Sequence, residues 1–166
     1  MFFAFKMESE ENQIDLDQLA ISPIAVPMSS EKMTKKLLTL VSKLSKLRLI
    51  KRGVKEVNKY FRKKDNKQKS FCVLAGDVSP VDVISHIPIL CEKNKVPYIY
   101  IPSRQLLGTA SSTKRPTSVV VLLEPPDDNK YHEKFVTLRG FVKKYDDNVD
   151  DDAQDEWFFY FYEVFY

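Results

Sequence analysis

The sequence is short of the residues on which most enzyme sites depend. Its 166 residues include two histidines, His86 and His132, and four glycines. Neither histidine accompanies a recognisable nucleophile motif, and four scattered glycines form no Gly-rich loop of the kind that cradles a phosphate. Asp77 and Asp82 follow an apolar run, where α/β enzymes place carboxylates, but they are also ordinary turn and first-turn acids. We therefore predict that the chain is not an enzyme.

Cysteine and long apolar runs are also scarce. Cys72 and Cys91 lie in apolar surroundings without metal-site spacing, so we expect no metal, no cofactor, no disulfide framework and a reducing compartment. No run of 18 apolar residues is present, which predicts no transmembrane helix and no membrane partner. The opening MFFAFKM lacks the basic region and cleavage site of a signal peptide, and none is expected.

Acidic residues are scarce in the middle of the chain. Residues 31–123 contain 20 lysines and arginines against 6 acids, a net charge of +14, whereas the flanks contain 6 against 17, a net charge of −11. The net charge of +3 for the whole chain hides this asymmetry. A strongly basic middle is typical of a protein that binds a polyanion. The alternative is a lysine-rich surface that contacts only solvent.

The spacing of apolar residues predicts helices that alternate with strands. Expected in chain order are helices at 31–47 and 54–63, a strand at 71–76, a helix at 80–95, a strand at 97–103, a short helix at 104–110, a strand at 118–124 and a helix at 131–145. A further strand at 20–28 or 48–52 is left open. This order predicts an α/β fold, a three-layer α-β-α sandwich around a small mixed four-stranded sheet.

Particular residues mark the ends and breaks of these elements. The segment ISPIAVPMSS is expected to lie extended on the domain, and one of its final serines caps the first helix. Ser79 is expected to cap the third helix, with Pro80 in its first position. Pro88 is expected to bend that helix, and Gly140 to interrupt the last one.

The chain divides into three parts. Residues 1–19 are predicted to be an acidic disordered tail, 20–145 the α-β-α domain, and 146–166 an acidic linker with an aromatic tail. The last ten residues hold eight of the twenty aromatics. They cover an exposed face, insert into a partner, form an aggregation-prone strand, or have no set structure.

The stretch LIKRGVKEVNK (49–59) combines a helix start with a concentration of basic residues. A helix N-terminus offers free N–H groups to phosphate, and Gly53 permits close approach to the backbone. Glu56, the single acid of the stretch, is suited to accept hydrogen bonds from amino or imino groups of bases. Charge-assisted contacts to phosphates are expected from Arg52, Lys55 and Lys59. The stretch therefore predicts RNA binding.

The segment GTASSTKRPTS (108–118) is a second candidate for RNA contact. Its small residues let a loop lie flat against irregular RNA, where splayed bases pack on it, and they are followed by Lys114, Arg115 and Pro116. With the strands arranged in the usual way, this loop and the stretch 49–59 lie at the same edge of the sandwich.

Four segments of the chain together resemble a known family. They are KRGVKEVNK, LAGDVSPVDVISHIPILCE, VPYIYIPSRQLLGTA and TKRPTSVVVLL, and they look like the H/ACA ribonucleoprotein complex subunit 2 family, within the kink-turn-binding ribosomal protein superfamily. The resemblance covers about residues 20–123. It implies a non-catalytic RNA-binding subunit of the H/ACA small nucleolar ribonucleoprotein, in the nucleus and nucleolus. The resemblance further implies that this subunit supports guide-RNA-directed pseudouridylation of rRNA and snRNA and ribosome biogenesis. The implied partners are H/ACA guide RNA, a pseudouridine synthase subunit and two small core proteins.

The resemblance also implies roles for single residues. In sister branches the kink-turn signature reads Gly, small, Asn, Glu, any, Thr, Lys, and this sequence keeps Gly53, Glu56 and Lys59. Lys55 stands in place of the Asn, and Asn58 in place of the Thr. The exchange of a base-reading amide for an ammonium implies weaker, shape-based RNA binding that needs partner proteins.

Further positions of the family motif lie outside the signature. Val83 and Arg104 fall where the family lines a pocket for an extruded base, and a loop that sets specificity includes Lys114, Arg115 and Pro116. Ser79 stands at a position that is acidic in the box C/D relative. The loop at 63–70 is about three residues longer than usual, and the aromatic tail has no counterpart in the family.

Two other interpretations remain open on the sequence. One is a box C/D, spliceosomal or ribosomal kink-turn RNA-binding protein. The other is a protein-interaction module whose basic face docks an acidic partner.

Overall fold

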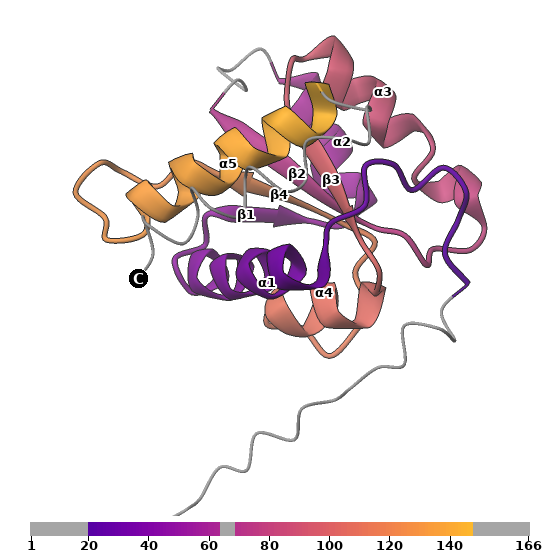
Figure 1. The fold of residues 1–166 in the computed structure, drawn as a ribbon, viewed down its shortest axis with the longest axis horizontal. Helices are drawn as coiled ribbons and strands as arrows, with labels where there is room; N and C mark the ends of the chain where they lie inside the picture. The colour runs from indigo at the N-terminus through magenta and orange to yellow at the C-terminus, as the bar shows by residue number, and fades with distance from the viewer. Residues whose placement is uncertain (1–19, 64–68, 148–166) are drawn as a thin grey trace, which may run out of the picture.

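The computed structural model describes residues 20–63 and 69–147. Its elements are α1 (Glu31–Lys46), β1 (Ile50–Arg52), α2 (Val54–Arg62), β2 (Ser70–Ala75), the 3-10 helix η2 (Val81–Val83), α3 (His86–Lys93), β3 (Tyr98–Ile101), α4 (Arg104–Ala110), β4 (Val119–Leu123) and α5 (His132–Asp147) (Figure 1). The predictions for the N-terminal tail, for the C-terminal tail beyond Asp147 and for 64–68 lie outside the described residues. In the described part, no helix is both long and apolar enough to cross a membrane.

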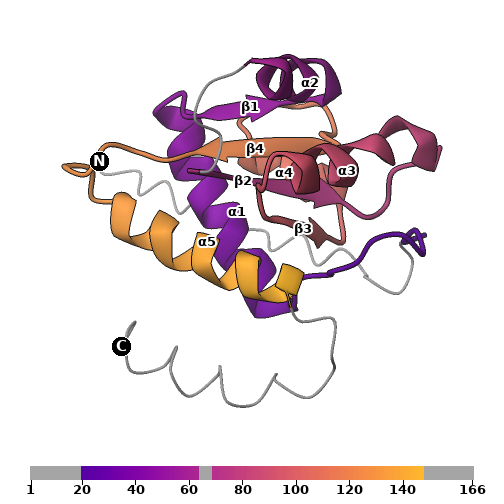
Figure 2. The same cartoon turned by 90° about the horizontal axis from the view of Figure 1, so that it is seen from above.

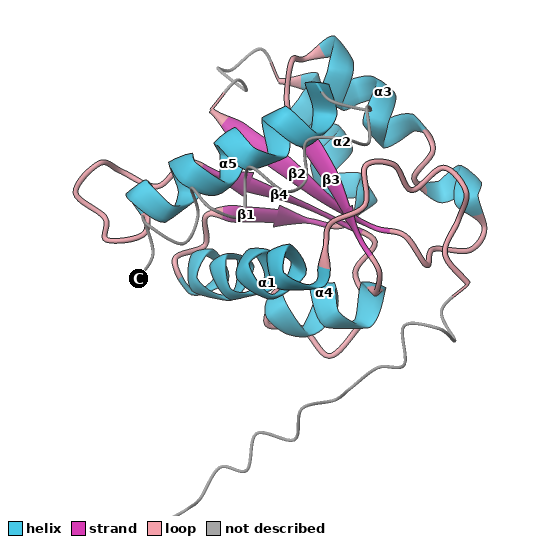
Figure 3. Ribbon diagram, in the orientation of Figure 1, coloured by secondary structure: helices cyan, strands magenta, loops and turns pink. Residues whose placement is uncertain are grey.

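The four strands form one mixed sheet in the order β1-β4-β2-β3 (Figure 2). β2 and β3 are parallel, and β4 is antiparallel to both of its neighbours, β1 and β2. The carboxyl ends of β1, β2 and β3 therefore meet the start of β4 at one end of the sheet (Figure 3). We call this end the carboxyl edge. Of the two places left open for a further strand, 48–52 provides β1.

Helices cover both faces of the sheet. Side chains alternate between the faces along a strand, and Phe71 of β2 contacts Phe135 of α5, with ring centroids 5.2 Å apart. α1 contacts both α4 and α5, so these three helices share that face. The neighbouring Cys72 points to the other face, where its thiol meets Cys91 of α3. A side-chain contact of α3 with Asn58 places α2 there as well. The predicted three-layer α-β-α sandwich is confirmed.

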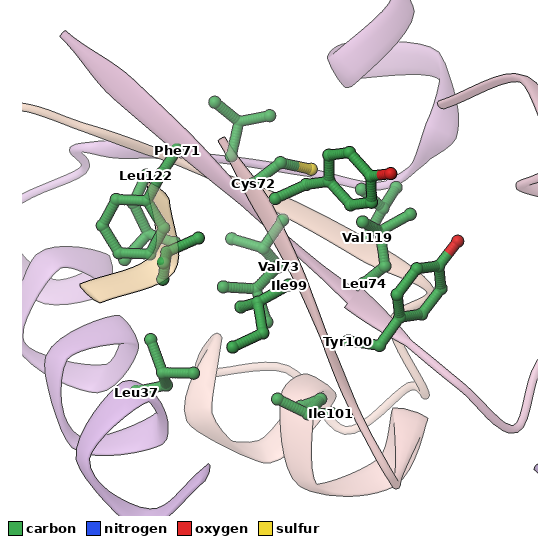
Figure 4. Close-up of a cluster of buried hydrophobic side chains, with 14 of the residues drawn as sticks. Leu37, Phe71, Cys72, Val73, Leu74, Ile99, Tyr100, Ile101, Val119 and Leu122 are labelled. Atoms are coloured by element: carbon green, nitrogen blue, oxygen red, sulfur yellow. The ribbon is translucent and has the colours of Figure 1, made fainter. Parts of the chain in front are cut away.

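The core lies on both sides of β2. All six residues of β2 are buried, so this strand is covered on both faces. Figure 4 shows the two layers: Phe71 and Val73 lie on the side of Leu37 from α1, whereas Cys72 and Leu74 point the opposite way. Tight packing on both faces of β2 and β3 holds these two strands, whose ends carry loops of the carboxyl edge.

The first helix forms where the sequence predicts it. Ser30 is its N-cap, and its hydroxyl accepts a hydrogen bond from the Met33 N–H. The apolar spacing buries one face of the helix, with Met33, Leu37, Leu40, Val41 and Leu44 in the core. α2 likewise buries Val57 and Phe61, as its pattern indicates.

The predicted third helix begins later than expected. Pro80 is extended, with ψ of 153°, so Ser79 does not cap a helix; a single 3-10 turn, η2, follows. α3 starts at His86, and Pro88 therefore lies in its first turn, where the absent N–H costs no helical hydrogen bond and no bend is needed. The last helix also differs, because α5 continues through Gly140. A buried face formed by Phe135, Leu138 and Val142 stabilises it across the glycine.

Residues 20–29 form a strap on the domain, and residues 27–29 at its end lie along the outer edge of β3. The Ser29 N–H donates to the Tyr100 carbonyl at 2.8 Å, and the Tyr100 N–H donates to the Pro27 carbonyl at 2.9 Å. The Ser22 N–H donates to the Gly76 carbonyl at 2.8 Å. The segment lies on the domain as predicted, but it is not extended throughout, because the Ala25 N–H donates to the Ser22 carbonyl at 3.0 Å in a turn.

Candidate nucleic-acid interface

Loops from four strands come together at the carboxyl edge. The Gly53 N–H donates to the Val119 carbonyl at 2.9 Å, which fixes the start of α2 against the start of β4. The Gly76 N–H donates to the Ile101 carbonyl at 2.8 Å, which joins the ends of β2 and β3. The stretch 49–59 and the loop before β4 therefore lie at the same edge, as the sequence indicates. Their contact with RNA stays a prediction.

Gly53 begins α2 with a backbone conformation that other residues rarely adopt. Its φ is 85° and its ψ 151°, a region essentially limited to glycine. Gly53 has no side chain to cap the helix, so the first-turn N–H groups receive no capping side-chain bond. A Cβ built on Gly53 would meet no atom within 4 Å. The space next to these N–H groups is open to an anion.

The first turns of α2 present three charged side chains to solvent. Lys55, Glu56 and Lys59 are all exposed. Within the described residues, none of the three side chains forms an ion pair or hydrogen bond. They are available for a ligand: two ammonium groups for phosphate, and one carboxylate that accepts hydrogen bonds.

Asn58 has a different role from its neighbours. Its side-chain oxygen Oδ1 lies 3.1 Å from Nε2 of His86, the first residue of α3. This bond holds α2 against α3, so the Asn58 side-chain oxygen already has a partner within the protein. It also gives His86 the structural role that its sequence context indicates. η2 ends three residues before His86, and its Val83, predicted to line a base pocket, is 40% exposed.

Arg52 fixes the loop between α4 and β4. Its guanidinium Nη1 donates a hydrogen bond of 2.6 Å to the carbonyl of Ser111. The Ser45 hydroxyl of α1 donates to the same carbonyl at 3.1 Å and lies 3.2 Å from the hydroxyl of Ser112. A predicted phosphate-binding residue thus also holds the second candidate loop in place.

Gly108 allows that loop to fold closely over α4. A Cβ at this position would meet the Arg115 carbonyl and come within 3.2 Å of the Pro116 Cα. The Thr113 N–H donates to the Gly108 carbonyl at 3.1 Å. This close approach turns Lys114, Arg115 and Pro116 outward, and all three are exposed.

Arg104 joins the remaining loops of the edge through its backbone. Its N–H donates to Oδ1 of Asp77 at 2.8 Å, and its carbonyl accepts from the Thr117 N–H at 3.1 Å. Asp77 is therefore a turn acid that satisfies the first N–H of α4, as expected. The Arg104 side chain is exposed. Apart from Val83, which lies on η2, the predicted site residues are thus on loops, helix starts and a strand end of one edge.

Sequence reasoning missed Ser45 and Ser111, which stabilise this edge through hydrogen bonds within the protein. Ser111 is buried and its carbonyl receives two of the bonds described above. The partners are 66 and 59 positions apart in the chain, and no local pattern marks them.

Comparison with known proteins identifies relatives of the chain. Residues 35–132 match the family described as ribosomal protein L7Ae/L30e/S12e/Gadd45. The H/ACA ribonucleoprotein complex subunit nhp2 of Schizosaccharomyces pombe is 52% identical over 139 residues, 82% of this chain and 88% of that protein. An H/ACA ribonucleoprotein complex subunit 2-like protein of Arabidopsis thaliana is 41% identical over 132 residues, 79% of this chain and 83% of that protein. A solved structure, the Giardia lamblia 15.5kD RNA binding protein, superposes with a TM-score of 0.65 at 29% identity, covering 75% of this chain and 99% of that one.

Proposed function

Because the chain belongs to the ribosomal protein L7Ae/L30e/S12e/Gadd45 family, we propose that it is an RNA-binding subunit of the H/ACA ribonucleoprotein. Within that family it belongs to the H/ACA ribonucleoprotein complex subunit 2 group, at 41% to 52% identity with the relatives above. The match extends over about four fifths of the chain and most of each relative. This membership is the observation that carries the proposal.

The geometry of the carboxyl edge supports an RNA ligand. Six exposed cations gather there together with the exposed acid Glu56. The cations are Arg52, Lys55, Lys59, Arg104, Lys114 and Arg115. Cations position the phosphate backbone without reading sequence, whereas a carboxylate accepts hydrogen bonds from base edges. In the proposed complex Glu56 reads an unpaired base and the cations hold the strand.

The same membership supports the finer assignments of this proposal. The RNA is an H/ACA guide RNA, and the partner proteins are a pseudouridine synthase subunit and two small core proteins. The site of action is the nucleolus, and the chain has no catalytic role of its own. Pseudouridine formation by the isolated chain is the direct assay of that last statement, and none is expected.

Replacing Glu56 and Lys59 together with alanine tests the site. The double variant is expected to lose most of its crosslinking to guide RNA, because it removes the base-reading carboxylate and a phosphate contact from exposed positions. Glu133→Ala with Lys134→Ala is the matched control, since it removes the same two residue types from the exposed side of α5. Unchanged crosslinking by the first variant, or equal loss by the control, would reject the site.

A kink-turn RNA-binding protein of the box C/D, spliceosomal or ribosomal type is the second candidate. The chain's retention of Gly53, Glu56 and Lys59 from the kink-turn signature favours it. A gel shift with an isolated kink-turn at fixed salt separates the two. Tight binding by the chain alone supports the kink-turn protein. Weak binding that strengthens with partner proteins supports the H/ACA subunit, because Lys55 replaces the base-reading amide of the signature.

A protein-interaction module makes a different prediction. Its partners would remain attached after ribonuclease treatment of the purified complex. The proposed RNA-binding subunit should lose those partners that RNA holds.

A further inference from the structure

Five lysines lie along the solvent side of α1. They recur at spacings of three, four and seven residues, which places them within an arc of about 100° around the helix axis. All five are exposed, while the opposite face of the helix is in the core. We call them the lysine stripe: Lys32, Lys35, Lys36, Lys43 and Lys46.

The lysine stripe is not balanced by acids of α1 itself, as the charges of an ordinary solvated helix usually are. Glu31 is the only acid of α1, and its ion pair with Lys35, at 3.3 Å, joins two side chains that are 74% and 70% exposed. Solvated helices usually alternate charges, because like charges one turn apart destabilise them. Burial and the charge of Lys32 lower the pKa of Lys36. The helix tolerates a repulsion that an anionic ligand would remove.

The lysine stripe extends from the candidate interface. Lys46 directly follows Ser45, whose hydroxyl bonds to the loop between α4 and β4. That loop carries Lys114 and Arg115. Figure 1 shows α1 and α4 side by side, so the stripe leads away from the loop along the underside of the domain. With 16 residues, α1 is about 24 Å long.

We propose that the lysine stripe is a second RNA-binding surface, which contacts the phosphates of a duplex arm leaving the carboxyl edge past the α4–β4 loop. The proposal rests on the proposed function, since the carboxyl edge anchors the RNA. Lysine is a compact, flexible charge that binds phosphate without reading bases. The stripe therefore orients the arm and adds affinity, without adding sequence preference.

Two RNAs and two triple variants of the full chain test this surface. The short RNA ends its duplex arm where the arm leaves the carboxyl edge, and the long RNA extends the arm beyond the length of α1. The stripe variant is K35Q/K43Q/K46Q. The control K93Q/K134Q/K143Q removes the same charge from exposed positions on α3 and α5. Affinity is measured for each pair over a series of salt concentrations.

The stripe variant is expected to bind the long RNA about tenfold or more weakly, with a salt-dependence slope lower by about 2 to 3. On the short RNA it should match the unmodified chain, and the control should match it on both RNAs. Unchanged binding of the long RNA, equal losses on both RNAs, or an equal loss by the control would overturn the proposal. Failure of the carboxyl-edge site itself appears separately, as unchanged binding of the short RNA by the Glu56→Ala, Lys59→Ala variant.

Discussion

Replacing Gly53 with alanine isolates the backbone requirement at the start of α2. Because φ is 85° and ψ 151°, a side chain there should cost about 1 to 3 kcal/mol of unfolding free energy. Space is not the reason, since a Cβ meets nothing. Gly140→Ala is the control: it lies inside α5 with equally open surroundings and should stabilise the chain by about 0.5 to 1 kcal/mol. Urea unfolding measures both, and equal effects of the two changes would contradict this account.

The Tyr100 hydroxyl is buried without a hydrogen-bond partner among the described residues. Burial, with smaller contributions from Cys72 and Cys91, raises its pKa to about 12. The unfolded phenol titrates near 10, so between about pH 10 and 12 only the unfolded state releases this proton. The free energy of unfolding should therefore fall as pH rises through this range, by at most about 1.4 kcal/mol per pH unit from this group.

Tyr100→Phe removes the phenol and with it that pH dependence. It breaks no hydrogen bond among the described residues. Relative to the unmodified chain, the variant should gain stability from pH 10 to 12 and differ little at pH 7. Burial also raises the pKa of the Cys72 thiol, but both proteins keep this thiol, so the difference between them reports the phenol. Parallel curves of unfolding free energy against pH would contradict the prediction.

At the scale of elements, the bond from Arg52 to the Ser111 carbonyl couples β1 to the α4–β4 loop. Arg52→Ala should loosen this loop, so amide hydrogen exchange at Thr113 and Thr117 should accelerate. Lys51→Ala is the control. Lys51 directly precedes Arg52 in β1, so its side chain points to the opposite face of the sheet. Similar exchange rates in the two variants would show that Arg52 acts only through its charge.

Local patterns predict those elements whose ends are set by local chemistry. The Ser30 cap and a regular apolar face define α1, and the buried run 71–75 lies within β2. The predicted start of α3 was wrong, because Ser79 and Pro80 resemble the beginning of a helix. The chain forms the 3-10 turn η2 there instead. The prediction that Gly140 interrupts the last helix was wrong, because packing on the buried side of α5 outweighs the low helix propensity of one glycine.

The candidate site was predictable in composition but not in construction. The charges of Lys55, Glu56 and Lys59 stand next to each other in the sequence, and the structure leaves them exposed. The bonds that hold the edge together join distant positions, as Arg52 with Ser111 and Asn58 with His86 do. Such contacts depend on how the layers pack, and no spacing rule encodes them.

For the whole molecule, the strap decides whether the sheet has an open side. Deleting residues 1–29 should uncover the outer edge of β3 and expose Gly76, which contacts Met28. Unpaired strand edges promote association between chains. The truncated chain should therefore unfold at a lower temperature and self-associate in light scattering. Deleting residues 1–19 alone preserves the strap and should change neither property; equal behaviour of both truncations would contradict the role of the strap.

The strap also has a consequence for synthesis of the chain. It leaves the ribosome before β3 does, yet Met28 bridges to Tyr100 and has no partner there until β3 has been made. The backbone bond of Gly53 forms later still, because its N–H donates to the carbonyl of Val119 in β4. The carboxyl edge therefore assembles only after almost the whole domain has been translated. A nascent chain displays its lysines early, but it has no finished interface with which to select an RNA.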